Sequence, residues 1–225
     1  MHSVIFDFNG TLFRDSEQHM AAWRVFADRY GKQVGEDELI KFFLGRANAF
    51  ILRRMFGDEI SDAQILRMAQ EKEGIYREIC LSDPANCHLV AGVPEFLNFL
   101  QSERVPFTIA TGSEKSNVDF YFRAFGLAQW FDRAKIVLDD GTFPGKPEPD
   151  CYLRAAKVLH AAPENCVVFE DSYSGVLAAK AAGVAGIVLI SEKAPERDEK
   201  NGVPILEVTK DFTGMIRAWK ERLSE

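Results

Sequence analysis

Short apolar runs alternate with helix-length segments over most of this chain, and this alternation is the strongest constraint on its fold. Val4–Phe6 is apolar and mostly β-branched, and runs of the same kind return from residue 106 onward. Short strands that alternate with longer helices are typical of a parallel, doubly wound sheet. The predicted strands are Val4–Phe6, Pro106–Ala110, Ala134–Leu138, Cys166–Phe169 and Ala185–Ile190.

Residues 14–88 show a different pattern, with apolar residues at helical spacing and no convincing strand. We therefore expect an α/β fold with a Rossmann-like doubly wound parallel sheet core (residues 1–13 and 89–225) and an inserted α-helical cap domain (residues 14–88), which could act as a lid. The helices predicted in the insert are Ser16–Tyr30, with Ser16 as its cap, Glu36–Leu44, Asn48–Phe56 and Asp62–Leu81. Those predicted in the core are Glu95–Glu103, Glu114–Phe125, Asp150–His160, Tyr173–Ala182 and Phe212–Leu223.

The composition narrows the range of partners. The 225 residues carry 27 Lys and Arg against 34 Asp and Glu, a formal net charge of −7 with no basic run, so we expect neither nucleic acid nor an anionic membrane as a partner. The longest apolar run, Val184–Ile190, is too short to span a membrane, and the first run ends at Asp7, which indicates no signal peptide. The four cysteines form no CxxC pair, which favours reduced thiols and a cytoplasmic location. We expect a monomer or a weak homodimer.

Polar residues follow four of the apolar segments, at the edge of a parallel sheet where ligands bind. They are Asp7, Thr111-Gly112-Ser113, Lys146 and Glu170-Asp171. Asp7 and Asp171 can hold Mg²⁺, which prefers oxygen ligands and usually retains waters and a substrate phosphate. Lys146 adds a positive charge, and Thr111 with the local amides can bind phosphoryl oxygens. This set is sufficient for phosphoryl transfer, which depends mainly on positioning and charge stabilisation.

These residues resemble the four motifs of the haloacid dehalogenase superfamily, in the subfamily whose helical cap lies between the first two motifs. The first motif, Asp-x-Asp-Gly-Thr, stands here as Asp7-Phe8-Asn9-Gly10-Thr11; the others match Thr111, Lys146 in a Gly-Lys-Pro context, and Glu170-Asp171-Ser172 with Gly175. The resemblance implies catalytic roles for Asp7, Asn9, Thr111 and Lys146, with Asp7 as the nucleophile that forms an aspartyl phosphate. It also implies a Mg²⁺ site made by Asp7, the Asn9 backbone carbonyl, Glu170 and Asp171, and phosphoryl binding by Thr111, Gly112, Ser113 and Lys146.

Within that superfamily the chain is most similar to the beta-phosphoglucomutase and sugar-phosphate phosphatase branch, which implies a small phosphorylated metabolite as substrate. His19 and Trp23 match a histidine and a tryptophan near the cap hinge, and Leu44–Asn48 resembles the substrate-specificity loop, where Arg46 could bind a second phosphate. Plainer interpretations remain open. His19 could be a partly buried helix residue, Trp23 cap packing and Arg46 a solvated side chain, and Ser113, Ser116 and Asn117 could serve as helix caps.

Asn9 departs from the family pattern, which has an aspartate there as the general acid–base. A carboxamide cannot transfer protons at neutral pH, and a positioned acid–base group typically contributes about 10²–10⁴-fold. The resemblance places the metal on the backbone carbonyl, which Asn9 retains. We therefore expect a site that binds Mg²⁺ and phosphate esters but turns over slowly, unless Asp15 or His19 supplies the proton.

Several functions are compatible with these motifs. The first is a Mg²⁺-dependent phosphatase, with a beta-phosphoglucomutase-like isomerase second; the rival class is a catalytically impaired phosphate-binding or regulatory protein. Asn9 could also be an engineered trap. Two other branches of the superfamily fit less well. Dehalogenases work without metal, which would leave Glu170-Asp171 without a purpose. Phosphonoacetaldehyde hydrolases form a Schiff base on a cap lysine, and the surroundings of the cap lysine Lys41 do not resemble that motif. The order of the residues argues against a response-regulator receiver.

Overall fold

The computed structural model describes residues 3–43, 46–192, 202 and 204–223, and it divides the chain into two compact units. One unit comprises residues 1–14 and 89–225, and the other comprises residues 15–88. We call them the core unit and the helical unit. The boundaries predicted from the sequence fell after residues 13 and 88.

The core unit contains a parallel sheet whose described strands number six, in the order β3-β2-β1-β4-β5-β6. The strands are β1 (Ser3–Phe6), β2 (Phe107–Glu114), β3 (Val137–Asp139), β4 (Cys166–Glu170), β5 (Gly186–Ile190) and β6 (Ile205–Thr209). The helices are α5 (Val93–Ser102), α6 (Lys115–Ala124), α7 (Asp150–Val158), α8 (Tyr173–Ala182) and α9 (Met215–Leu223), with 3₁₀ turns at Leu127–Gln129, Arg133–Lys135 and Pro163–Asn165. The α/β Rossmann-like fold predicted from the sequence is confirmed.

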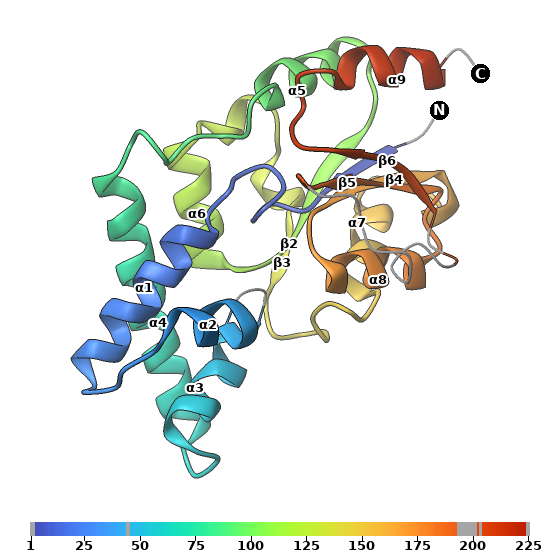
Figure 1. Cartoon of the computed structure of the whole chain (residues 1–225). Helices are drawn as coiled ribbons and strands as arrows, with labels where there is room; N and C mark the ends of the chain where they lie inside the picture. Colours follow the sequence, from blue (N-terminus) through green and yellow to red (C-terminus); the bar gives the residue numbers. More distant parts are fainter. Residues whose placement is uncertain (1–2, 44–45, 193–201, 203, 224–225) are drawn as a thin grey trace. The chain divides into compact units, whose positions relative to one another are not determined.

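The two faces of the sheet are covered by different helices. Figure 1 shows α5 and α9 along one side of the sheet and α7 and α8 along the other. On the first side Phe6, Phe96 and Phe169 pack with Trp219 in an aromatic core. On the second side small and branched residues of α7 and α8 pack on β1, β4 and β5. Strand β1 pairs with β2 and β4 along its two edges, and helices cover both faces of the sheet (Figure 1), so β1 is fully buried. The residue that follows it emerges at the carboxyl-terminal edge of the sheet, near its centre.

Some predicted core elements were wrong in detail. The strand β6 was missed because Ile205–Thr209 is a partly exposed edge strand beside a charged segment, most of which lies outside the described residues. The strand predicted at Ala134–Leu138 begins only at Val137, because residues 133–135 form a 3₁₀ turn whose start is capped by the Asp132 carboxylate. Strand β2 continues to Glu114, so α6 begins one residue later than predicted.

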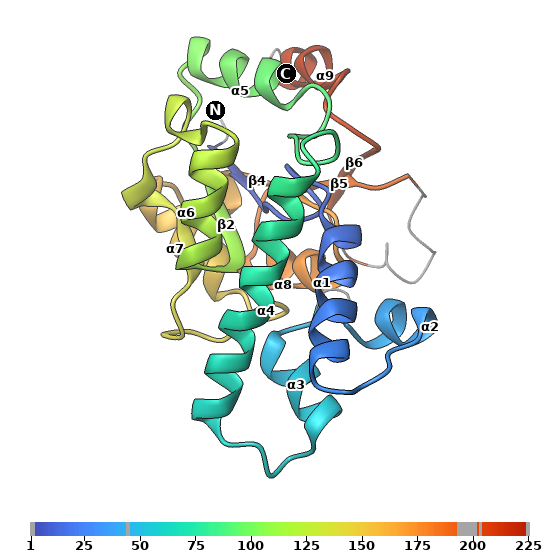
Figure 2. The same cartoon turned by 90° about the vertical axis from the view of Figure 1, so that its left-hand side faces the viewer.

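The helical unit consists of α1 (Ser16–Arg29), α2 (Glu36–Glu38), a π-helical turn (Leu39–Phe43), α3 (Asn48–Phe56) and α4 (Asp62–Ser82). Figure 2 shows α1 and α4 side by side along their length. The predicted cap at Ser16 was wrong, because the helix starts at Ser16 with Asp15 before it, and the predicted helix at 36–44 is α only as far as Glu38. None of the helices in the described ranges is long and apolar enough to cross a bilayer.

Candidate active site

Asp7 stands directly after the central strand and is paired with a lysine. Its backbone N–H continues the β1–β4 ladder by donating to the Phe169 carbonyl over 2.9 Å. The Lys146 ammonium donates to Asp7 Oδ1 over 2.6 Å and to Glu170 Oε1 over 2.5 Å. Both carboxylates are buried, so the lysine lies between two negative charges at the carboxyl ends of β1 and β4.

Glu170, the last residue of β4, is held in place by several donors. The Tyr152 hydroxyl donates to Oε1 over 2.9 Å, and the backbone N–H groups of Asp171 and Ser172 each donate to Oε2 over 2.7 Å. A Cβ atom at position 175 would lie 1.6 Å from Oε1, so only glycine fits there. The arrangement makes Glu170 a rigid anchor for Lys146.

Asp171 extends the acidic cluster toward the first loop. Its Oδ1 accepts a hydrogen bond from Thr11 Oγ1 over 3.1 Å. Gly10 has a φ of +85°, and a Cβ atom there would lie 2.0 Å from Asp171 Oδ2. The glycine of the first motif therefore serves both the turn and the close approach of Asp171.

The charges of this cluster do not balance. Burial raises the pKa of Asp7 to about 7, with Glu170 acting in the same direction and Lys146 opposing both. Burial, together with repulsion from Glu170 and Asp7, raises the pKa of Asp171 well above its usual range. Burial also disfavours the charged forms of Glu170 and Lys146, but their ion pair prevails, so the pKa of Glu170 is lowered and that of Lys146 is raised.

The same cluster has the donor set of a hard divalent cation. One carboxylate oxygen from each of Asp7, Glu170 and Asp171 lies within 4.8 Å of the others. Three carboxylates against a single lysine leave a surplus of negative charge, which a bound cation would neutralise, and oxygen ligands suit Mg²⁺. The residues present therefore fit a magnesium ion.

Asn9 lies among hydroxyl groups beside this cluster. Its Nδ2 donates to the Tyr121 hydroxyl over 2.8 Å, and its Oδ1 accepts from Thr111 Oγ1 over 3.2 Å and from Ser113 Oγ over 2.7 Å. The Ser113 backbone N–H donates to Thr111 Oγ1 over 3.0 Å. Strand β2 thus brings Thr111 and Ser113 to Asn9, with the exposed Gly112 between them.

The other predicted site residues, His19 and Arg46, belong to the helical unit. His19 Nδ1 lies 2.7 Å from Lys72 Nζ, its Nε2 lies 3.3 Å from Asp15 Oδ2, and its ring stacks on Tyr76 with centroids 3.9 Å apart. Asp15 also accepts from the Tyr76 hydroxyl over 2.7 Å. Both proton donors proposed from the sequence therefore take part in one hydrogen-bonded cluster.

Arg46 lies over an aromatic ring, with its guanidinium carbon 5.4 Å from the centroid of the Phe50 ring. Two residues of the predicted specificity loop, Leu44 and Gly45, lie outside the described residues. The roles of His19 and Arg46 in substrate binding stay predictions.

Several residues with clear contacts were not predicted. Tyr121 and Tyr152 are buried aromatic residues of α6 and α7, and nothing in the sequence distinguishes them from core residues. Thr11 was visible in the first motif but was not selected. Lys72 was also missed, although its helical spacing from Met68, Ile75 and Tyr76 places it on the apolar face of a predicted helix and was a usable signal. The possible helix cap Ser116 contacts Glu114 over 2.5 Å, and Asn117 is buried.

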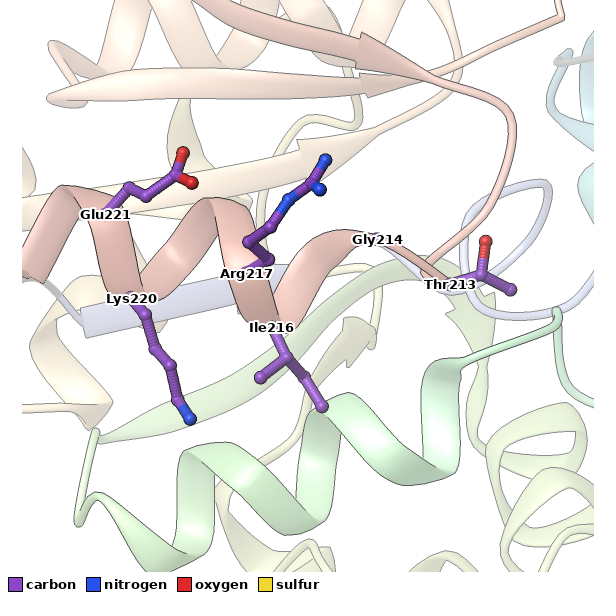
Figure 3. Close-up of a pocket in the computed structure, with 6 residues that line it drawn as sticks. All are labelled: Thr213, Gly214, Ile216, Arg217, Lys220 and Glu221. Atoms are coloured by element: carbon purple, nitrogen blue, oxygen red, sulfur yellow. The ribbon is translucent and has the colours of Figure 1, made fainter.

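A shallow pocket of about 670 Å³ lies along α9 and contains none of the predicted site residues. Figure 3 shows Lys220 and Ile216 pointing from α9 toward α5, where the Lys220 ammonium lies 5.5 Å from the centroid of the Phe99 ring. The pocket is lined by Thr213, Gly214, Ile216, Arg217, Lys220 and Glu221. These lining residues form no carboxylate cluster comparable to that around Asp7.

Comparisons with known proteins agree with this geometry. The family model of haloacid dehalogenase-like hydrolases matches residues 1–183. A phosphorylated carbohydrates phosphatase of Thermotoga maritima is 35% identical over 193 residues, covering 83% of this chain and 84% of the relative. A solved haloacid dehalogenase (HAD) hydrolase of family IA from Entamoeba histolytica is 35% identical with a TM-score of 0.85, covering 94% of each chain.

A solved putative beta-phosphoglucomutase from Thermotoga maritima is 28% identical with a TM-score of 0.73, covering 98% of this chain and 99% of that one. The superfamily resemblance noted in the four motifs is thereby confirmed. This chain belongs to the haloacid dehalogenase-like hydrolases.

Proposed function

We propose that this protein is a Mg²⁺-dependent phosphatase that acts on a small phosphorylated metabolite, a sugar phosphate, through an aspartyl phosphate on Asp7. The observation that carries the proposal is the cluster of Asp7, Lys146, Glu170 and Asp171 at one sheet edge. A sugar phosphate is supported by the similarity of this chain to a phosphorylated carbohydrates phosphatase.

In the proposed reaction Asp7 attacks the phosphorus atom with a carboxylate oxygen, and the bond to the leaving oxygen breaks. Lys146, fixed by Glu170, would attract the phosphoryl oxygens toward Asp7. Thr111, Gly112 and Ser113 would contribute a hydroxyl and backbone N–H groups to the same phosphoryl group. These residues mainly orient the reacting atoms and stabilise charge.

Mg²⁺ would be held by Asp7 and Asp171, with the Asn9 backbone carbonyl and Glu170 as the further ligands that the family resemblance implies. When bound, it would neutralise the phosphate charge and allow a dianion to approach the Asp7 carboxylate. Glu170 already accepts from Lys146, Tyr152 and backbone N–H groups, so its contribution would be to hold Lys146 as much as the metal.

A screen of phosphate esters with Mg²⁺ tests this proposal. We expect release of inorganic phosphate from phosphosugars that is lost in Asp7→Asn and on addition of EDTA. Turnover equal to that of Asp7→Asn for every ester would count against a phosphatase and favour the rival class, a phosphate-binding protein without efficient catalysis, which the amide at position 9 supports.

The second candidate is a beta-phosphoglucomutase-like isomerase, supported by the similarity to the solved putative beta-phosphoglucomutase. The same screen separates the two enzymes by product. A phosphatase releases inorganic phosphate, whereas a mutase returns an isomeric sugar phosphate that ³¹P NMR distinguishes from its substrate.

A further inference from the structure

The Asn9 side chain is part of a closed ring of hydrogen bonds. Nδ2 lies 2.8 Å from Tyr121 Oη, Oδ1 lies 2.7 Å from Ser113 Oγ, and the two hydroxyl oxygens lie 3.2 Å apart. We propose that this ring fixes the orientation of the Asn9 carboxamide, with Tyr121 as a positioning residue. The site then acts on phosphate esters whose leaving oxygen departs without a proton from the enzyme. This inference rests on the proposed phosphatase function.

The ring has one consistent direction. The Asn9 amide donates to Tyr121 Oη, so the tyrosine proton points elsewhere, and Ser113 Oγ, 3.2 Å away, can accept it. Ser113 in turn donates to Asn9 Oδ1, which closes the ring. A hydroxyl has one proton to give, and hydrogen bonds that run in one direction polarise and strengthen one another.

A carboxylate would not complete this ring. An ionised aspartate accepts hydrogen bonds but donates none, so both Tyr121 and Ser113 would turn their protons toward position 9. The bond between the two hydroxyls would then be lost. The surroundings of Asn9 are thus matched to an amide, which supplies one donor and one acceptor to the ring.

Tyr121 is fixed independently of this ring. Its side chain is 1% exposed, and its ring stacks on Phe8 with centroids 4.3 Å apart and planes 19° from parallel. The hydroxyl is therefore presented to Asn9 and Ser113 by a rigid ring. Its proton is used within the ring, and the ammonium of Lys146 is likewise engaged by Asp7 and Glu170.

These constraints select the leaving group. When Asp7 attacks, the new oxygen–phosphorus bond forms while the bond to the leaving oxygen breaks, and that oxygen keeps the electron pair and later takes a proton from water. Departure as an anion is easier for acidic alcohols and acids, so aryl, enol and acyl phosphates are favoured over simple alkyl phosphates. Among sugar phosphates, esters of the anomeric hydroxyl are favoured, because this hydroxyl is more acidic than the others. Water then attacks the phosphorus of the aspartyl phosphate and loses its proton to solvent. Without a base at position 9 this second step is slow, and the phosphoenzyme accumulates.

The substrate test uses the full chain with Mg²⁺ and three esters of decreasing leaving-group acidity: 4-nitrophenyl, phenyl and ethyl phosphate. We expect wild type to release 4-nitrophenol in a burst and to leave ethyl phosphate almost untouched. Asn9→Asp should raise the rate of the first step, measured as release of the alcohol in a single turnover, by about 10²–10⁴-fold for ethyl phosphate and by less than about tenfold for 4-nitrophenyl phosphate. It should also reduce the burst, because the second step gains a base.

The outcomes separate this inference from the proposed function. Equal stimulation of the first step for all three esters by Asn9→Asp, or a first step in wild type whose rate is independent of the leaving group, would overturn the inference but leave the phosphatase. A weak dependence of the wild-type rate on leaving-group acidity that becomes steep in His19→Ala or Asp15→Asn would also overturn the inference. It would mean that His19 or Asp15 of the helical unit supplies the proton in wild type. Release no faster than in Asp7→Asn from any ester would overturn the proposed function as well.

The ring itself is tested by NMR without turnover. The side-chain amide signals of Asn9 are identified as the pair that disappears from the ¹H–¹⁵N spectrum in Asn9→Asp. In Tyr121→Phe, which keeps the stacked ring and removes the hydroxyl, these signals should shift and exchange faster with water. Tyr30→Phe, which removes an exposed hydroxyl bonded to Glu71, is the matched control. Unchanged Asn9 signals in Tyr121→Phe would rule the ring out.

Discussion

Each unit of this protein contains a largely buried lysine engaged by carboxylates, and these two lysines have opposite electrostatics. Lys146 in the core unit contacts both Asp7 and Glu170, and the pair of carboxylates raises its pKa despite burial. Lys72 in the helical unit contacts Glu73 over 2.8 Å and the His19 ring, and here burial prevails and lowers its pKa. Lys146 contacts two carboxylates directly, whereas Lys72 contacts one, with Asp15 as a second and weaker influence, and this difference decides the sign.

The difference shows which cluster is built for a ligand. Around Lys146 the carboxylates outnumber the cation, and burial raises the pKa of Asp7 and of Asp171, so the cluster gains from a bound cation. Around Lys72 the carboxylate in direct contact is Glu73, Asp15 is reached through His19, and the rings of Trp23 and Tyr76 lie 5.1 and 5.5 Å from the ammonium. The two carboxylates of this second cluster are engaged by Lys72, His19 and Tyr76, and the cluster holds α1 on α4.

The largest effect is expected when the core cluster loses its nucleophile. Asp7→Asn should lower kcat by on the order of 10⁴-fold or more, because an amide is a poor nucleophile and nothing replaces the bond that Asp7 forms. The measurement is steady-state release of phosphate from the best ester. Asp140→Asn, which neutralises an exposed carboxylate after β3, is the control and should keep wild-type turnover. A loss of less than tenfold in Asp7→Asn would exclude Asp7 as the nucleophile.

The motifs at the strand ends supplied most of the site residues that could be predicted from the sequence. Asp7 and Glu170 could be predicted because each follows a short apolar segment, and parallel strands bring their carboxyl ends to one edge. Lys146, in the loop after β3, could be predicted from its Gly-Lys-Pro context. Tyr121 could not, because it is 112 residues from Asn9 and has the local pattern of a core aromatic residue. Contacts between distant segments depend on how α6 packs, which local pattern does not encode.

The second prediction removes the lysine of the helical unit. Lys72→Met should lower the free energy of unfolding by about 3–5 kcal/mol, because Glu73 keeps its buried charge and loses its cation. The double variant Lys72→Met/Glu73→Gln should recover most of this loss, since the carboxamide oxygen introduced at position 73 can still accept from Asn48. Urea unfolding measures both. A double variant as unstable as the single one would show that the cluster is not a simple balanced pair.

The third prediction concerns the glycine beside Glu170. Gly175→Ala should cost about 1–3 kcal/mol of folding free energy, because its Cβ would lie 1.6 Å from Glu170 Oε1 and the carboxylate would have to move. The matched control is Gly74→Ala in α4, where the nearest side-chain atom is 3.9 Å away. That change should be stabilising by about 0.5–1 kcal/mol, as for glycine inside a helix. Equal effects at the two positions would contradict the close packing around Glu170.

The smallest effect, and the one that tests the charge surplus directly, is the pH dependence of Mg²⁺ binding. The pKa of Asp7 is about 7 in the folded protein against an ordinary value of 3.8, so the folded state binds this proton more tightly than the unfolded state. Without metal, the Asp7 contribution to stability should therefore decline as the pH rises from about 4 to about 7. Mg²⁺ competes with the same proton, so its affinity should rise by up to about tenfold per pH unit toward pH 7 and then level off.

Melting temperatures with MgCl₂ or EDTA at pH 6 and pH 8 measure this competition. The gain on adding Mg²⁺ should be larger at pH 8, and Asp171→Asn should reduce it because one oxygen ligand is lost. Glu73→Gln should lower stability with and without Mg²⁺ alike, since Glu73 is paired with Lys72 and is not one of the three carboxylates of the candidate metal site. A Mg²⁺ shift of the same size at both pH values would mean that Asp7 binds the metal without releasing a proton, and that Lys146 already keeps its carboxylate ionised.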